Sequence, residues 1–175
     1  DMDALERTLD ELASAGNKPR YIYTIPTVQN PTATIMSRAR RVRMVELAKA
    51  HGIPIFEDEC YSDLIWDGQR PPAVYALDDS SRTIFLGTFS KSIAPALRVG
   101  YVVAPWSVLS RMLACKTDAG SGALEQMVLG EYCPRHFDAH VARLNKLLKA
   151  KLDVLVDALN EQFGTAAEFA LPKGG

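Results

Sequence analysis

Short apolar runs alternate along this chain with stretches in which hydrophobic residues recur at helical spacing. The apolar runs have the β-branched and aromatic character of strands, and they lie at residues 21–25, 53–56, 83–86 and 99–103. Continuous apolar strands separated by helices are typical of a sheet that is covered on both faces. The pattern therefore predicts an α/β fold with a mostly parallel sheet.

Helices are predicted between the strands and throughout the last third of the chain. Ser37 can cap one helix, and Gly52 supplies its C-terminal stop. Shorter helices are predicted over residues 5–12, 108–116 and 124–132. From residue 141 to residue 163, apolar side chains recur at steps of three or four. This spacing predicts one long amphipathic helix that begins near residue 138.

The composition argues against several classes of protein. Lys and Arg number 20 against 21 Asp and Glu, and this balance disfavours a binder of nucleic acid or of anionic membranes. No stretch approaches the roughly 18–20 apolar residues that a membrane span requires. The three cysteines lie far apart with no C-x-x-C spacing, which predicts a reducing, cytoplasmic setting and no disulfide framework.

The two ends of the chain suggest a piece of a longer protein. Residues 5–12 already form part of a helical repeat, and the chain stops on a turn signal at residues 172–175. We therefore expect an internal fragment.

Polar side chains stand where the predicted strands end. In an open parallel sheet, ligands bind at the carboxyl ends of the strands. An amide, a carboxylate with a phenol, a lysine flanked by hydroxyls and an arginine should meet at that edge. Such a set can hold a phosphorylated, nitrogen-containing aromatic cofactor. The residues are Asn30, Asp58, Tyr61, Thr88, Ser90, Lys91 and Arg98.

Four motifs in this order resemble the large domain of a class I/II aminotransferase, a pyridoxal-phosphate enzyme of fold type I. They are Asn30-Pro31-Thr32, Asp58-x-x-Tyr61, Thr88-x-Ser90-Lys91 and, seven residues later, Arg98. The resemblance extends over residues 19–175, and the strings around Lys91 and at residues 103–105 are similar to the branch of 2-aminoadipate, aromatic and branched-chain aminotransferases. It implies pyridoxal 5'-phosphate as cofactor, an amino acid and a 2-oxo acid as substrates, ping-pong transamination and a homodimer.

The resemblance also implies a role for each site residue. Lys91 would form the Schiff base with the cofactor and carry the α-proton. Asp58 would keep the pyridine nitrogen protonated, so that the ring withdraws electrons. Tyr61 and Asn30 would hydrogen-bond the phenolic oxygen of the ring. The phosphate would be held by Arg98, Thr88 and Ser90.

The same resemblance implies a division of the chain into two parts. Residues 1–137 would be the C-terminal part of the cofactor-binding large domain, and residues 138–175 the long interdomain helix with the truncated start of a small domain. In this family an upstream helix N-terminus binds the phosphate and a downstream arginine binds the substrate carboxylate. Since neither lies in the chain, we expect the isolated segment to bind cofactor weakly and to be inactive.

Other features have simpler interpretations. Ala33 stands where the family usually has glycine, and we expect a slightly altered turn there. His136 and His140 have the spacing of metal ligands, but no third ligand is apparent and no metal site is predicted. Trp66 and Trp106 are interpreted as packing residues. A solvated helix face is predicted for the basic cluster Arg38, Arg40, Arg41 and Arg43.

Two alternatives to a transaminase remain open. A lyase or decarboxylase of the same fold would use the same cofactor anchors, because only the missing substrate-binding parts distinguish it. The strings Gly-Thr-Phe-Ser-Lys and Pro-Ala-Leu-Arg are also similar to the pyridoxal-phosphate-binding sensor domain of a group of transcription regulators. Intact Asn30, Asp58 and Tyr61 favour catalysis over sensing.

Overall fold

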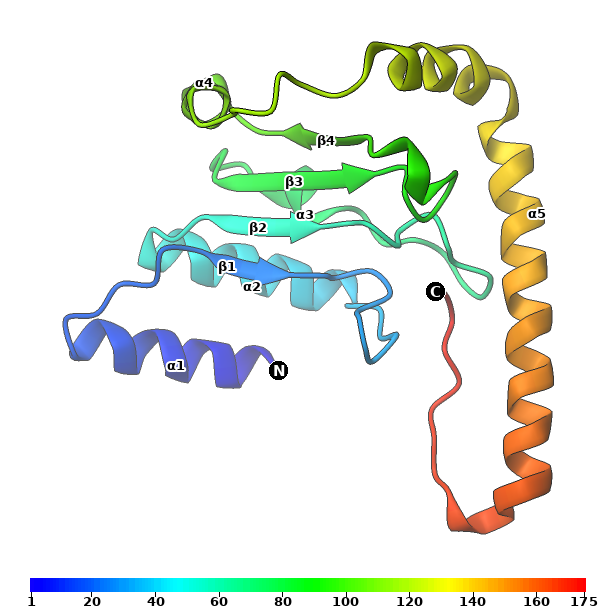
Figure 1. Ribbon diagram of the computed structural model, residues 1–175. Helices are drawn as coiled ribbons and strands as arrows, with labels where there is room; N and C mark the ends of the chain where they lie inside the picture. The colour runs from blue at the N-terminus through cyan, green and yellow to red at the C-terminus, as the bar shows by residue number, and fades with distance from the viewer.

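A four-stranded sheet forms the centre of the molecule in the computed structural model, which describes residues 1–175 (Figure 1). The strands follow one another across the sheet in sequence order: β1 (Ile22–Thr24), β2 (Ile55–Asp58), β3 (Thr83–Thr88) and β4 (Gly100–Val103). The first three run parallel, and β4 pairs antiparallel with β3. The prediction of an α/β fold with a mostly parallel sheet is confirmed.

The reversed direction of β4 follows from its short connection. A crossover helix joins each parallel pair, whereas only residues 89–99, with the 3-10 turn η1 (Pro95–Leu97), join β3 to β4. Parallel strands need a crossover of a dozen or more residues, so this connection returns the chain in the opposite direction.

Helices α1 (Met2–Ser14), α2 (Arg38–His51) and α3 (Val74–Leu77) lie on one side of the sheet (Figure 1). Helix α2 begins and ends as predicted, because the Ser37 side chain accepts a hydrogen bond from the Arg40 amide and Gly52 adopts a left-handed conformation. The largest core cluster joins α2, β2 and α3 through Met44, Ile55 and Val74. A second cluster joins α1 to α2 and to the chain just before β2, through Leu9, Leu47 and Ile53.

The opposite face of the sheet is open. No helix covers the face turned toward the viewer in Figure 1. Tyr23 of β1 and Tyr21, two residues before it, are exposed aromatic side chains of this face, each at 54% of its full exposure. The continuous apolar strands predict a sheet covered on both faces, and this prediction is wrong for the chain, because helices cover one face only.

The last third of the chain contains α4 (Trp106–Ala114) and α5 (Ala123–Phe163). The predicted helices at 124–132 and from about 138 are one helix of 41 residues, with Pro134 inside it. Figure 1 shows a sharp bend in the first half of α5, and proline is an ordinary cause of such bends. The domain boundary predicted at residue 138 falls within this helix and stays a prediction.

Beyond its bend, α5 runs past the carboxyl ends of the strands, and the chain then returns toward them (Figure 1). The turn η2 (Gly164–Ala166) reverses the direction, and Gly174 forms an isolated bridge with Ile65. The Trp66 indole donates a hydrogen bond to the carbonyl of Pro172. Trp66 is therefore a packing residue as predicted, but Trp106 is not, because it is 71% exposed on α4. None of the helices combines the length and the apolar composition that a membrane crossing requires.

Candidate functional site

The predicted site residues lie at and beyond the ends of three neighbouring strands. Asp58 is the last residue of β2 and Thr88 the last residue of β3. Asn30 follows β1 in a loop, where its peptide bond to Pro31 is cis. Because β1, β2 and β3 are parallel, their carboxyl ends meet at one edge of the sheet, as the sequence predicts.

Both oxygens of the Asp58 carboxylate have a donor. The Tyr23 hydroxyl donates to Oδ2 at 2.7 Å, and the backbone N–H of Cys60 donates to Oδ1 at 3.2 Å. The hydrogen bond to Asp58 is the largest of the effects that raise the pKa of Tyr23 to about 12, so the phenol keeps its proton at neutral pH. The sequence reasoning missed Tyr23, because its place beside Asp58 depends on the pairing register of β1 and β2.

Lys91 and Tyr61 lie close together beside Asp58. The Lys91 Nζ is 5.8 Å from the centre of the Tyr61 ring, within the range of a cation–π contact. Burial and the Asp58 carboxylate raise the pKa of the Cys60 thiol to about 12, against a smaller lowering by the Lys91 charge. The charges of both Asp58 and Lys91 therefore affect the pKa of Cys60. At physiological pH its thiol is neutral.

The hydroxyl groups after β3 form a compact turn. The Thr88 Oγ1 lies 3.0 Å from the Ser90 Oγ and accepts a hydrogen bond from the Ser90 backbone N–H at 3.1 Å. Arg98 ends the 3-10 turn in a left-handed conformation and donates to the carbonyl of Pro95 at 3.1 Å. The guanidinium is exposed, and its one hydrogen bond lies within its own turn. The structure thus pairs Thr88 with Ser90 but does not bring Arg98 into contact with another site residue.

Two of the predicted site residues, Asn30 and Tyr61, line a cavity of about 210 Å³. Its wall includes Val28 and Ala33, which adopt left-handed backbone conformations with φ of 56° and 54°. This conformation is rare for a β-branched residue, and Val28 is buried as well. Backbone strain of this kind concentrates at ligand sites, where the surrounding structure holds it in place.

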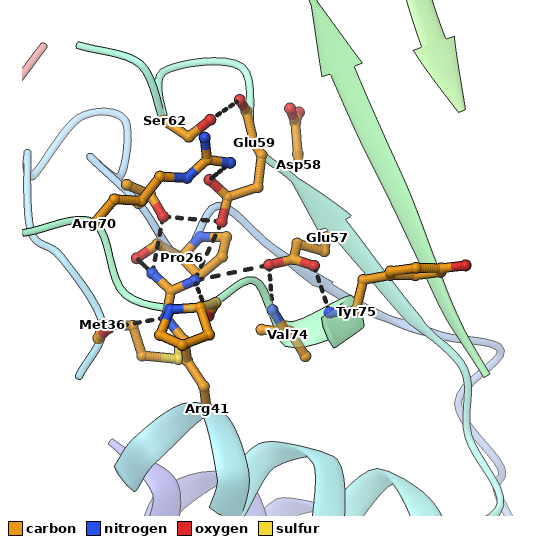
Figure 2. A network of polar contacts seen from close by, with 12 residues as sticks. Pro26, Met36, Arg41, Glu57, Asp58, Glu59, Ser62, Arg70, Val74 and Tyr75 are labelled. Carbon is orange, nitrogen blue, oxygen red and sulfur yellow. Dashed lines mark hydrogen bonds and ion pairs between the residues drawn. The ribbon is translucent and has the colours of Figure 1, made fainter. Parts of the chain in front are cut away.

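A buried ionic cluster lies on the other side of β2 (Figure 2). Arg41, Glu57 and Glu59 have fully buried side chains, and the Arg41 Nη1 is 3.2 Å from Glu59 Oε1 and 3.7 Å from Glu57 Oε1. The other guanidinium nitrogen, Nη2, donates to the hydroxyl of Thr27 and the carbonyl of Pro26. The prediction of a solvated Arg41 was wrong. Position 41 lies three, four and seven residues before the core positions 44, 45 and 48, which is the spacing of one helix face.

Side chains alternate along β2 and the residue after it, so the three successive acidic residues 57–59 point to opposite sides. Figure 2 shows Glu57 and Glu59 pointing toward Arg41, while Asp58 points away from it. Glu57 also accepts hydrogen bonds from the backbone N–H groups of Val74 and Tyr75 at the start of α3. Burial raises the pKa of Glu57 to about 7 in spite of these two donors. The cluster thus fixes the strand end that presents Asp58 to the open face.

Residues 1–172 match the family model of aminotransferase class I and II. The chain belongs to this family. The match covers all the predicted site residues and nearly the whole chain, so it confirms the family resemblance of the four motifs.

Known relatives of this aminotransferase-family chain include enzymes and regulators. An uncharacterised aminotransferase of Saccharolobus solfataricus is 35% identical over 100% of this chain and 44% of its own length. An uncharacterised HTH-type transcriptional regulator of Bacillus subtilis is 34% identical over 95% of this chain and 37% of its own length. The chain therefore spans less than half the length of these relatives.

A solved structure of the family has the same fold. The α-aminoadipate aminotransferase LysN of Thermus thermophilus, complexed with N-(5'-phosphopyridoxyl)-L-leucine, superposes with a TM-score of 0.91 at 29% identity. The alignment covers 100% of this chain and 45% of that one.

The donor set at the strand ends fits the cofactor of this family. The Asp58 carboxylate has about four lone-pair sites and uses two of them, so it can still accept a hydrogen bond from a protonated ring nitrogen. Lys91 makes neither a hydrogen bond nor an ion pair, and its amine is exposed beside Tyr61. The hydroxyls of Thr88 and Ser90 offer donors to a phosphate. No group of three His, Cys, Asp or Glu side chains is arranged to hold a metal ion.

Proposed function

We propose that the whole protein is a pyridoxal-phosphate-dependent amino acid:2-oxo acid aminotransferase in which Lys91 binds the cofactor covalently. One observation carries the proposal: the acid Asp58 ends a parallel strand, and the amine of Lys91 lies beside the ring of Tyr61, three residues after that acid. Family membership supports this function, and so does the solved relative complexed with a phosphopyridoxyl amino acid.

Each residue of the proposed site has a definite task. Bound pyridoxal phosphate supplies a ring that withdraws electrons from the α-carbon of the substrate. Asp58 accepts a hydrogen bond from the ring nitrogen, and Lys91 takes and returns the α-proton through its Nζ. Tyr61 and Asn30, which line the same cavity, donate hydrogen bonds to the ring oxygen. The phosphate is bound by Thr88, Ser90 and Arg98.

The proposal extends to the organisation of the whole protein. Residues 1–137 are the C-terminal part of the cofactor-binding domain, and residues 138–175 lead into a small domain. The substrates are an amino acid and a 2-oxo acid, which react in turn by a ping-pong mechanism. The whole protein is a homodimer. Less than half of the length of the relatives is present in this chain, so the isolated segment should bind cofactor weakly.

Reductive labelling tests the assignment of Lys91. The whole protein is incubated with pyridoxal phosphate, reduced with borohydride and digested, and the labelled lysine is located by mass spectrometry. We expect one label at Lys91, and none in a Lys91→Ala variant. Lys116→Ala is the matched control, because Lys116 is exposed and pairs with Asp118 in the loop between α4 and α5. Equal labelling of Lys91→Ala would contradict the proposal.

A second candidate function is a ligand-sensing domain of a transcription regulator. The regulator of Bacillus subtilis that is 34% identical over 95% of this chain favours it. A sensor would bind the same cofactor through the same residues without turning over substrate. Release of a 2-oxo acid from an added amino acid distinguishes the transaminase from the sensor, and release of carbon dioxide or ammonia would identify a lyase.

A further inference from the structure

Tyr23 stands next to the proposed site but belongs to none of the four family motifs. It lies on β1, and its hydroxyl is 2.7 Å from Oδ2 of Asp58 on β2, thirty-five residues later in the chain. Among the side chains, it is the one that hydrogen-bonds Asp58. The phenol is the donor in this hydrogen bond, which is the largest of the effects that raise its pKa to about 12.

Strand pairing explains why the two side chains meet. Tyr23 is the partner of Phe56 in the parallel register of β1 and β2, and Asp58 follows Phe56 by two residues. Side chains two residues apart on a strand share a face, so Tyr23 and Asp58 are diagonal neighbours on the open face of the sheet. A tyrosine is long enough to reach across that diagonal.

The two donors to Asp58 fix the carboxylate in different ways. The Cys60 amide belongs to the backbone that follows Asp58, so any residue at position 60 except proline could supply it. The Tyr23 hydroxyl comes from the neighbouring strand and limits the rotation of the carboxylate about its side-chain bonds. Hydrogen bonds to an ionised group are stronger than those between neutral groups, so this contact restrains the carboxylate firmly.

We propose that Tyr23 is a positioning residue for the transamination, which holds the Asp58 carboxylate in the orientation that receives the ring nitrogen of the cofactor. The inference rests on the proposed function and adds to it a residue outside the family motifs. Tyr23 does not touch the substrate in this role, and it acts through Asp58.

A double-mutant cycle in the whole protein, loaded with pyridoxal phosphate, tests this role. Tyr23→Phe removes only the hydroxyl, and we expect kcat to fall about tenfold, which is typical for a lost hydrogen bond to a charged group. The KM for the amino acid should stay within about twofold, because Tyr23 makes no contact that binds substrate. In an Asp58→Asn background, the same substitution should change kcat by less than about twofold, because the effect passes through Asp58.

Tyr21→Phe is the matched control. Tyr21 lies just before the same strand and has the same exposure of 54%, but its hydroxyl makes no hydrogen bond and its ring packs on Phe56. We expect its kcat to be unchanged. The absorption maximum of the bound cofactor should shift in Tyr23→Phe and not in Tyr21→Phe, and a purely structural role for Tyr23 would not produce that shift.

The outcomes separate this inference from the function on which it rests. An unchanged kcat in Tyr23→Phe would overturn the inference and leave the aminotransferase proposal standing. A loss of the same size in the Asp58 and the Asp58→Asn backgrounds would also overturn it, since Tyr23 would then act independently of Asp58. If the unsubstituted protein releases no 2-oxo acid, the proposed function fails, and the inference fails with it.

Discussion

Ala33 carries a strained backbone in the loop that bears Asn30. Its φ is 54°, a left-handed conformation that costs an L-residue roughly 1–2 kcal/mol. Ala33→Gly should therefore raise the free energy of unfolding by about 0.5–1 kcal/mol, which is the relief of strain less the greater chain entropy of glycine. Urea unfolding of this chain measures the change.

The matched control for this substitution is Ala39→Gly. Ala39 is exposed within α2, where glycine should lower the free energy of unfolding by about 1 kcal/mol. Opposite signs for the two substitutions would show that the backbone conformation of Ala33 is the cause. A loss of stability at both positions would contradict the strain.

Glu57 makes the stability of the fold depend on pH. Burial raises its pKa from 4.5 to about 7, so the folded chain binds this proton more tightly than the unfolded chain does. Between these two values the contribution of Glu57 to the free energy of unfolding falls as the pH rises. Glu57→Gln should remove this downward slope between about pH 4.5 and 7.

Urea unfolding at a series of pH values measures that slope. The absolute stability of Glu57→Gln also changes. The two carboxylate oxygens of Glu57 accept hydrogen bonds from Val74 and Tyr75, whereas a glutamine side chain has only one oxygen that can accept. The slope is therefore the informative quantity. Glu46→Gln is the control, since Glu46 lies on the exposed side of α2 and pairs with Arg43 at the surface. Equal slopes in the two variants would contradict the raised pKa of Glu57.

The residues of the candidate site differ in how well the sequence predicts them. Asp58 and Thr88 are predictable, because each follows an apolar run by two residues. Such residues lie at the carboxyl end of a strand, and the carboxyl ends of parallel strands share one edge of the sheet. Tyr23 is not, because its partner is set by the register between two strands thirty residues apart. Arg41 is predictable in principle from the helical spacing of the core residues around it, but the three neighbouring arginines conceal this signal.

Helix α2 and strand β2 depend on one another through the buried ionic cluster. Arg41 is the one cation whose side chain is buried against Glu57 and Glu59, so its removal leaves two carboxylates without their main counter-charge. Arg41→Met keeps an unbranched side chain but removes the guanidinium, and it should lower the free energy of unfolding by about 3–5 kcal/mol. Urea unfolding at neutral pH measures the loss.

The control is Arg38→Met on the exposed start of the same helix. This change should alter stability by no more than about 0.5 kcal/mol. Equal effects at the two positions would show that helix propensity, and not the buried cluster, is the cause. If Arg41→Met does not fold at all, Arg41→Lys keeps one positive charge and should recover part of the native circular dichroism.

The element boundaries show which local signals suffice. The ends of α2 are predicted from Ser37 and Gly52, because both residues act locally. Ser37 accepts a hydrogen bond from a backbone N–H three residues later, and Gly52 donates its own N–H to carbonyls in the last turn. Pro134 suggests a helix end, yet α5 continues through it. Proline removes one backbone donor, and a long helix on both sides can absorb that loss with a bend. The direction of β4 depends on the length of its connection, which apolar patterning does not reveal.

At the scale of the whole molecule, α5 is weakly attached. Of its 41 residues only Leu129 is buried, whereas α2 buries five of 14. Beyond the bend, its contact with the β2–α3 loop includes Asn145, whose side-chain N–H groups donate to the carbonyls of Asp63 and Ile65. Helices depend mainly on the burial of an apolar face, so these two helices should differ in local stability.

Amide hydrogen exchange of this chain measures that difference. We expect the backbone amides of residues 148–160 in α5 to exchange at least about tenfold faster than those of residues 42–48 in α2, because local opening costs less where few side chains are buried. Both segments are helical and form the same kind of backbone hydrogen bond, so the type of hydrogen bond does not explain a difference in their exchange rates. Asn145→Ala should accelerate exchange in the α5 segment and leave the α2 segment unchanged, because it releases the helix from the β2–α3 loop. Equal protection of the two segments would mean that α5 is held by contacts other than those of Leu129 and Asn145.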